Sequence, residues 1–288
     1  MISDAFDTPL LQQWIGNTEV TDARIDARTA AALAATLDRP FSFAAGAALP
    51  PLWHWAYFWP AAPQRELGSD GHPQRGGFLP PVPLPRRMWA GGRLTFSAPV
   101  PIDADAKRTS TVQSAAAKTG GSGQLVFITV RHEIAHRGTI CITEEHDIVY
   151  RAMPQPGAAS PAAKLAPGDA AWSRTVTPDP VLLFRYSALT FNGHRIHYDR
   201  SYVTEVEGYP GLVVHGPLIA TLLADLVQRH LPAARMSAFS FRAVGPLFDT
   251  EPFTLCGRPD PNGRTVHLWA QNMRGELAMQ AEATLAGD

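Results

Sequence analysis

Residues 215–286 decide the fold of this chain, and they read HGPLIATLLADLVQRHLPAARMSAFSFRAVGPLFDTEPFTLCGRPDPNGRTVHLWAQNMRGELAMQAEATLA. Apolar residues recur at helical spacing through 217–230, and Pro217 suits the first helical position. The segments 236–248, 251–259, 264–273 and 275–286 have the alternation or apolarity of strands, and the PDPNG and NMRG segments between them have turn chemistry. This order predicts one helix followed by an antiparallel meander.

The first half of the chain repeats this order. It offers a helix over 26–37 and strands over 92–103, 123–134 and 139–152, separated by TGGSG and HRG turns. The text LTFSAPVPID (94–103) stands where FSFRAVGPLFD (239–249) stands in the second half, and AHRGTICITEEHDIVY (135–150) stands where NMRGELAMQAEATL (272–285) stands. We therefore predict an α+β double hotdog, two tandem units in which a curled antiparallel sheet wraps a long central helix.

A segment rich in Pro, Ala and Gly, AMPQPGAASPAAKLAPGDA (152–170), has the composition of a linker between the units. We place the units at 1–155 and 156–288. The first unit also carries an insertion over about 50–92 that holds many prolines and the aromatic residues Trp53, Trp55, Tyr57, Phe58, Trp59, Phe78 and Trp89. So aromatic a loop is expected to pack as a lid over the helix end, or to wall a ligand pocket.

The composition excludes several function classes. The 288 residues carry a formal net charge of -1, so no global basic field exists to hold nucleic acid or an anionic membrane. The first residues lack a signal-peptide pattern and no apolar run approaches a membrane span, so we expect a cytoplasmic protein. Cys141 and Cys256 have no metal-type spacing and are expected in the core.

The residues that carry chemistry gather in FRYSALTFNGHRIHYDRSYVTEVEGYPGLVVHGP (184–217). Asn192, His194 and His197 share one short loop, whereas a lone loop histidine is more often a surface residue. The GLVVHG segment brings His215 and Gly216 to the start of the long helix, where free N–H groups and the positive dipole end favour developing negative charge. A base beside an oxyanion site is the minimum that an enzyme needs.

The segment YSALTFNGHRIHYDRSYVTEVEGYPGLVVHGPLIATLL (186–223) resembles the hydratase motif of the MaoC-like (R)-specific hydratase/dehydratase family. It is more similar still to the tandem hotdog branch of that family. This branch contains mesaconyl-C4-CoA (3-methylfumaryl-CoA) hydratases, itaconyl-CoA hydratases and type 2 hydroxyacyl-thioester dehydratases. The resemblance extends over nearly the whole chain.

The resemblance implies a role for each motif position. His197 matches the catalytic histidine, and the backbone N–H of Gly216 would hold the thioester oxygen. Asn192 stands where the commoner motif has its catalytic aspartate, and His194 stands where that motif has asparagine. Because an amide cannot take a proton, we expect His197 to be the general base while Asn192 positions the water. His194 or Asp199 would carry a second proton or fix the tautomer of His197.

The expected reaction is hydration of a 2-enoyl-CoA, or dehydration of the 3-hydroxyacyl-CoA, by a hydro-lyase that uses no metal or other cofactor. The resemblance suggests a small branched dicarboxylyl-CoA such as mesaconyl-C4-CoA as the substrate. An arginine could pair with a free carboxylate or with the phosphates of coenzyme A. The expected substrate-binding residues are Arg195, Tyr198, Asp199, His215, Arg86, Arg93 and Trp89, and the first unit is expected to be catalytically silent.

Three other functions remain open at this point. A hotdog thioesterase would place a carboxylate on or near the central helix, but Asp225, the only acidic residue there, lies two turns in and fits poorly. Asn192 in place of aspartate would suit a non-catalytic acyl-thioester binding protein. The aromatic insertion could instead serve a protein-interaction module. A tandem pair can stand alone, and a homodimer is also possible.

Overall fold

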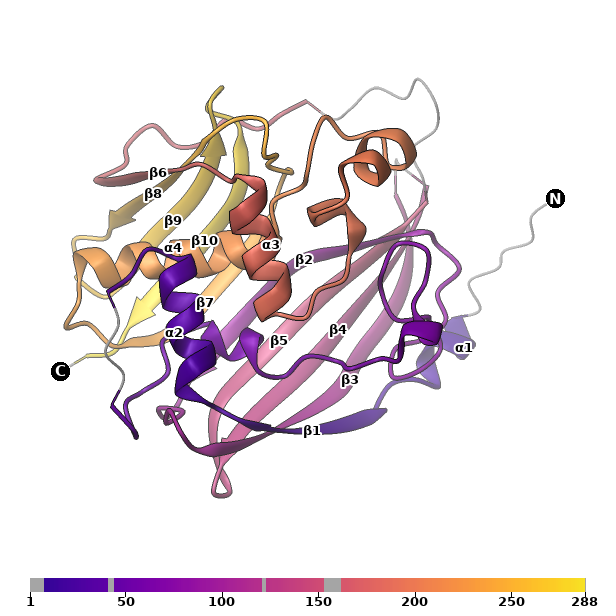
Figure 1. The fold of residues 1–288 in the computed structure, drawn as a ribbon, viewed down its shortest axis with the longest axis horizontal. Coiled ribbons are helices and arrows are strands. Elements are labelled where there is room, and N and C mark those ends of the chain that lie inside the picture. Colours follow the sequence, from indigo (N-terminus) through magenta and orange to yellow (C-terminus); the bar gives the residue numbers. More distant parts are fainter. Residues whose placement is uncertain (1–7, 41–43, 121–122, 153–161, 288) are drawn as a thin grey trace.

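A computed structural model describes residues 8–40, 44–120, 123–152 and 162–287. Ten strands form one antiparallel sheet in the order β1-β3-β4-β5-β2-β7-β10-β9-β8-β6 (Figure 1). The first half contributes α1 Thr8–Gln12, β1 Thr18–Arg24, α2 Ala27–Thr36, β2 Arg86–Phe96, β3 Asp105–Gly120, β4 Gly123–His136 and β5 Thr139–Arg151. The second half contributes β6 Trp172–Val176, α3 Pro180–Leu189, α4 Gly216–His230, β7 Met236–Ala243, β8 Phe253–Pro259, β9 Thr265–Asn272 and β10 Leu277–Leu285.

The sheet consists of two equivalent halves. From each outer edge the strands follow the same pattern, β1-β3-β4-β5-β2 in one half and β6-β8-β9-β10-β7 in the other. The halves meet where β2 pairs with β7, from Gly91 opposite Arg242 to Thr95 opposite Ala238. The predicted double hotdog is confirmed, and the two sequence matches fall on equivalent strands, β2 with β7 and β5 with β10. The predicted unit boundary near 155 lies outside the described residues.

The central helix of the second half is α4, which agrees with the predicted helix over 217–230. Its residues Leu218 to Val227 are all buried, so it is apolar on every side and lies inside the fold rather than on it (Figure 1). The exception in polarity is Asp225, whose buried carboxylate pairs with the guanidinium groups of Arg39, Arg174 and Arg229. These three contacts offset the cost of burying a charge inside the helix core.

The first half differs from the second half in the segment between its edge strand and β2. The predicted helix over 26–37 is present as α2, with Asp26 as its N-cap, and it packs beside α3, which has Asp179 as its N-cap. By its place directly after the edge strand, α2 corresponds to α3 rather than to α4. Between α2 and β2 the described residues form two short 3-10 helices, Trp53–Ala56 and Gln64–Glu66, instead of a second long helix.

The aromatic insertion is packed into the protein. Trp53 and Phe58 are buried in the main core, and the hydroxyl of Tyr57 donates to the Asp26 carbonyl at the start of α2. Strand β2 begins at Arg86, so the insertion ends earlier than the predicted residue 92, and Trp89 belongs to a strand. Within the described residues, no helix combines the length and the apolarity needed to cross a membrane.

Candidate active site

His197 is buried at the end of a short 3-10 helix, Arg195–His197, that follows α3. Its Nδ1 lies 2.7 Å from the carbonyl oxygen of Val213, in the extended segment that leads into α4. Since a carbonyl only accepts, Nδ1 must carry the hydrogen, and this leaves a lone pair on Nε2. The local fold thus fixes the tautomer that a general base needs.

The surroundings keep His197 neutral. The pKa of His197 is lowered to about 3, chiefly by burial and also by the neighbouring His194, while the hydrogen bond to Val213 acts in the opposite direction. At neutral pH the imidazole is therefore unprotonated and available to accept a proton.

His215 forms a platform under His197. The two rings stack with 3.7 Å between centroids and 17° between planes. His215 is fully buried, its Nε2 lies 2.8 Å from the Ser187 hydroxyl on α3, and burial lowers its pKa well below the usual value. A neutral ring in this place positions His197 without adding a repelling charge.

Helix α4 begins at Gly216, directly after this histidine platform, with His215 as its N-cap. The first N–H groups of a helix have no partner within the helix, so they point outward and can bind an oxyanion. A Cβ at position 216 would lie 2.7 Å from a ring carbon of Trp89, which itself stacks on Phe241 at 4.3 Å between centroids. Glycine is therefore required here by an aromatic ring that β2 of the first half supplies.

Asn192 lies at the start of the loop that carries the histidines. Its side-chain oxygen accepts the backbone N–H of His194 at 3.0 Å, and its own backbone N–H donates to the Ser187 carbonyl. The carboxamide oxygen thus shapes the loop, and the amide nitrogen is the part of the side chain left to bind a water molecule.

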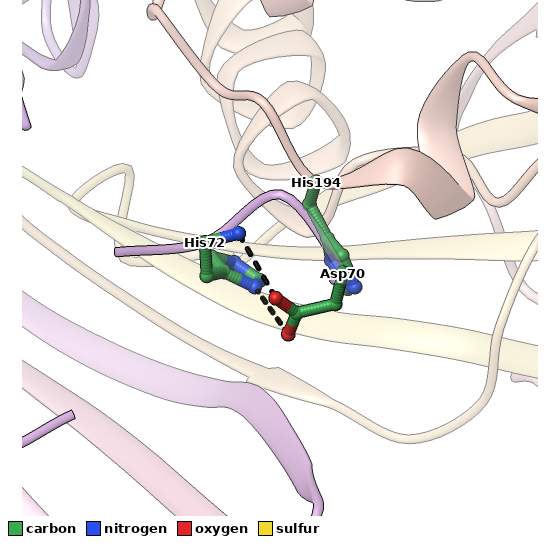
Figure 2. A group of neighbouring side chains, drawn as sticks. All are labelled: Asp70, His72 and His194. Atoms are coloured by element: carbon green, nitrogen blue, oxygen red, sulfur yellow. Dashed lines mark hydrogen bonds and ion pairs between the residues drawn. The ribbon is translucent and has the colours of Figure 1, made fainter. Parts of the chain in front are cut away.

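The insertion of the first half reaches this loop. A Cβ on Gly71 would lie 1.9 Å from the carbonyl oxygen of Gly193, so the two backbones touch with no room for a side chain. The Arg195 N–H donates to the carbonyl of Asp70 at 2.9 Å, which fixes the contact. The ring of His72 lies 4.1 Å from that of His194, between centroids (Figure 2).

Asp70, His72 and His194 form a compact group (Figure 2). The Asp70 carboxylate accepts the Nδ1–H of His72 at 3.2 Å and its backbone N–H at 3.0 Å. Burial alone would raise the pKa of Asp70, but these bonds and the nearby histidines lower it well below its usual value. One ligand atom from each residue lies within 4.8 Å of the others, a spacing that could hold a divalent cation.

Comparison with known proteins identifies the family. The family described as hydroxyacyl-thioester dehydratase type 2 matches residues 52–249. The chain belongs to this family.

One relative is the mesaconyl-C4-CoA hydratase of Chloroflexus aurantiacus, 52% identical over 95% of this chain and 97% of that protein. Among solved structures, a MaoC-like dehydratase from Phytophthora capsici superposes with a TM-score of 0.70 at 14% identity, over 97% of this chain and 98% of that one. A Mycobacterium tuberculosis protein with a double hotdog fold superposes with a TM-score of 0.58 at 14% identity, over 94% of this chain and 96% of that one. The last two likenesses show the fold alone.

In this dehydratase-family protein, several residues predicted to bind substrate have other partners. Arg195 pairs with the Asp199 carboxylate at 2.8 Å, and Asp199 also accepts the Tyr202 backbone N–H. Asp199 therefore organises the loop, and Val213 rather than Asp199 sets the tautomer of His197.

Of the remaining predicted residues, Tyr198 and Arg86 contact the segment 192–207, whereas Arg93 lies away from it. The Tyr198 hydroxyl donates to the Gly193 carbonyl, and Arg86 pairs with Glu207 at 3.2 Å. Arg93 pairs with Glu145 and Asp147 on the outer face of the sheet, opposite the site. Of the predicted set, His194, His197, His215, Gly216 and Trp89 come together, whereas Arg93 does not join them.

Sequence reasoning missed several residues that contact the histidines of this candidate site. Ser187 and Val213 hold the two stacked rings, but nothing in their local sequence marks them. Asp70 and His72 are the acidic residue and histidine of the segment SDGHP, and this pairing within a glycine-containing turn was a usable signal.

Proposed function

We propose that the protein adds water across the C2=C3 bond of a 2-enoyl-CoA, and removes it in the reverse direction, with His197 as the general base. The supporting observation is the buried imidazole with its Nδ1–H held by Val213 and its Nε2 free, close to the first turn of α4. Family membership supports the reaction class, and the roles of the individual residues are part of this proposal.

In the proposed mechanism, Nε2 of His197 takes a proton from water as its oxygen attacks C3. The electrons of the double bond move to the thioester oxygen, where the Gly216 N–H stabilises the enolate. The imidazolium then passes its proton to C2, directly or through a second group that relays it, and the ring stack with His215 keeps the imidazole in place. Removing one oxyanion donor costs about 3–4 kcal/mol in other enzymes, so Gly216 should matter as much as the base.

The remaining motif residues fit supporting roles. The amide nitrogen of Asn192 would hold the attacking water, because its oxygen is used in the loop. His194 is the better candidate for a second proton carrier, because Asp199 is engaged by Arg195 and by backbone N–H groups. These groups together supply base, water site and oxyanion donor, so the proposed chemistry uses no cofactor.

For the substrate we propose a small branched dicarboxylyl-CoA such as mesaconyl-C4-CoA, which is the compound named for the Chloroflexus relative. A thioesterase reaction is less well supported, because the carboxylate of Asp225 is buried and paired with three arginines. We also propose a cytoplasmic location and leave open a further pairing into a homodimer.

The test follows loss of enoyl-thioester absorbance with mesaconyl-C4-CoA and with crotonyl-CoA, in the wild type and in His197→Ala. We expect loss of absorbance that the variant abolishes, without release of free thiol. Release of free thiol from either substrate would instead make the protein a thioesterase. An undiminished rate in His197→Ala would remove this residue as the base.

A further inference from the structure

Arg87 lies on the face of the sheet that carries the active site. Through this part of β2 the register with β5 is regular, with Arg87 opposite Tyr150 and Trp89 opposite Ile148. Side chains two residues apart on a strand point to the same face, so Arg87 shares the face of Trp89, whose ring lies against Gly216. The two residues are about 7 Å apart along the strand.

Among the described residues, the guanidinium of Arg87 has no hydrogen-bond or ion-pair partner. Arg86, Arg93 and Arg195 each pair with a carboxylate, but Arg87 makes neither a hydrogen bond nor an ion pair with any residue in the described ranges. Its charge nevertheless acts on a neighbouring residue of β5. Burial is the main cause that lowers the pKa of His146, and the positive charge of Arg87 lowers it further.

Polar side chains lie further along the same face of the sheet. Tyr150 and Ile148 of β5 stand opposite Arg87 and Trp89. Beyond them, Glu144 and His146 of β5 face the same side as Arg87, together with His132 of β4. Glu144 accepts hydrogen bonds from the ring nitrogens of His54 and Trp55, while Nε2 of His146 is buried without a hydrogen-bond partner among the described residues. A hydrocarbon chain laid over the His146 nitrogen would leave it without a partner, which is unfavourable, whereas a short polar acyl group could supply one.

We propose that Arg87 binds the free carboxylate of a dicarboxylyl acyl group, with the buried nitrogen of His146 at the edge of the same subsite. This inference rests on the proposed function and names the part of the substrate that the site selects. In mesaconyl-C4-CoA the free carboxylate is attached to C3, the carbon that receives water, so its binding group must lie beside the base.

The pairing also has a chemical purpose. A carboxylate on C3 opposes the approach of an electron-rich water oxygen and the build-up of enolate charge next to it. A guanidinium that holds both carboxylate oxygens offsets that charge and orients C3 toward His197. A neutral Asn192 at the start of the loop fits such a substrate better than a second carboxylate would.

The experiment compares substrates that differ only at this position. Mesaconyl-C4-CoA, 3-methylcrotonyl-CoA, in which a methyl group replaces the carboxylate, and crotonyl-CoA are tested with the wild type, Arg87→Met and Arg87→Lys. We expect Arg87→Met to lower kcat/KM for mesaconyl-C4-CoA by roughly 100-fold or more, with Arg87→Lys between the two. Rates with the two substrates without a carboxylate should change by less than about 3-fold, as expected when only a pairing with the missing group is lost. Arg131→Met, which loses a half-buried ion pair with Glu133 on the outer face, is the matched control.

A binding measurement separates this proposal from the proposed function. In the His197→Ala background, the affinity for mesaconyl-C4-CoA should fall when Arg87→Met is added, and that for crotonyl-CoA should not. Equal losses for all substrates, or no loss for mesaconyl-C4-CoA, would overturn the subsite even if hydration is confirmed. Arg87→Lys serves the same test if Arg87→Met does not fold, because it then must favour the carboxylate substrate less than the wild type does.

Discussion

Lowering the pH from 7.5 to 5.5 should reduce the free energy of unfolding of this protein, while the imidazole of His197 stays neutral in the folded state. The pKa of His197 and that of His194 are lowered to about 3, and that of His215 is lowered well below its usual value, in each case chiefly by burial. In the unfolded chain each ring titrates near its ordinary value of about 6.5. Below pH 6.5 the three rings therefore bind protons in the unfolded state but not in the folded state, so the free energy of unfolding falls as the pH falls.

The magnitude follows from the same pKa differences. At pH 5.5 each ring that stays neutral in the fold costs about 1.4 kcal/mol relative to pH 7.5, so the three rings together cost about 4 kcal/mol. Glu144, whose pKa is lowered to about 2 mainly by the hydrogen bond and charge of His54 against the opposing effect of burial, stays ionised throughout this range and adds nothing. His132 and His146, with pKa values lowered to about 4 and about 3 by burial, add to the loss.

Urea unfolding followed by tryptophan fluorescence at the two pH values measures this loss. The variant His194→Gln should reduce the loss by about one third of the three-ring value, because one titrating ring is removed. Initial hydration rates measured before unfolding should hardly change between the two pH values, since His197 remains neutral. Unchanged or higher stability at pH 5.5, or an acid limb of kcat/KM near pH 6.5, would refute the reasoning.

Three substitutions test the geometry of the site and the core. Gly216→Ala places a Cβ 2.7 Å from the Trp89 ring, which is itself stacked on Phe241, so the start of α4 must shift. We expect kcat, measured by steady-state kinetics, to fall at least 10-fold. Urea unfolding should show a stability loss of about 1–3 kcal/mol. Gly71→Ala puts a Cβ 1.9 Å from the Gly193 carbonyl at a φ of +89°, so the two loops must separate. Activity should fall about 100-fold with a stability loss of about 1–3 kcal/mol, and wild-type kinetics would show that the loop contact is dispensable. Asp225→Asn leaves three arginines without their buried counter-charge and should cost about 3–5 kcal/mol in denaturant unfolding. The control Glu133→Gln removes a half-buried ion pair on the outer face and should cost less than about 1 kcal/mol.

Local patterns in the sequence were enough for much of the fold. Helix α4 and most strands of the meander were predicted because their apolar periodicity is strong and short turns bound them. Helix α3 was missed because Val181 and Phe184 are apolar yet exposed, so the expected pattern of one buried face is hidden. Strand β3 was missed for a related reason, since its long polar sequence buries only small or isolated side chains such as Ser110 and Val112.

Some residues of the candidate site could likewise be predicted from local sequence, and others could not. His197, His215 and Gly216 could be predicted because one contiguous motif carries them and the resemblance assigns their roles. The sequence does not place Asp70, His72 or Arg87 beside the motif, because that proximity comes from the contact between Gly71 and Gly193 and from the pairing of β2 with its neighbours. Such contacts depend on the assembled tertiary structure and have no local sequence periodicity.

The close approach of Trp89 to Gly216 has a consequence for how this chain can vary. In a symmetric pair of identical hotdogs, each copy both carries a base and contacts the site of the other copy. Every residue must therefore suit both roles. Here the copies are joined in one chain, and the ring that dictates glycine at position 216 comes from the copy without the motif. Genetic screens for inactive enzyme should therefore find lesions in the first half, around residues 69–72 and 87–89, as often as in the half that carries the histidines.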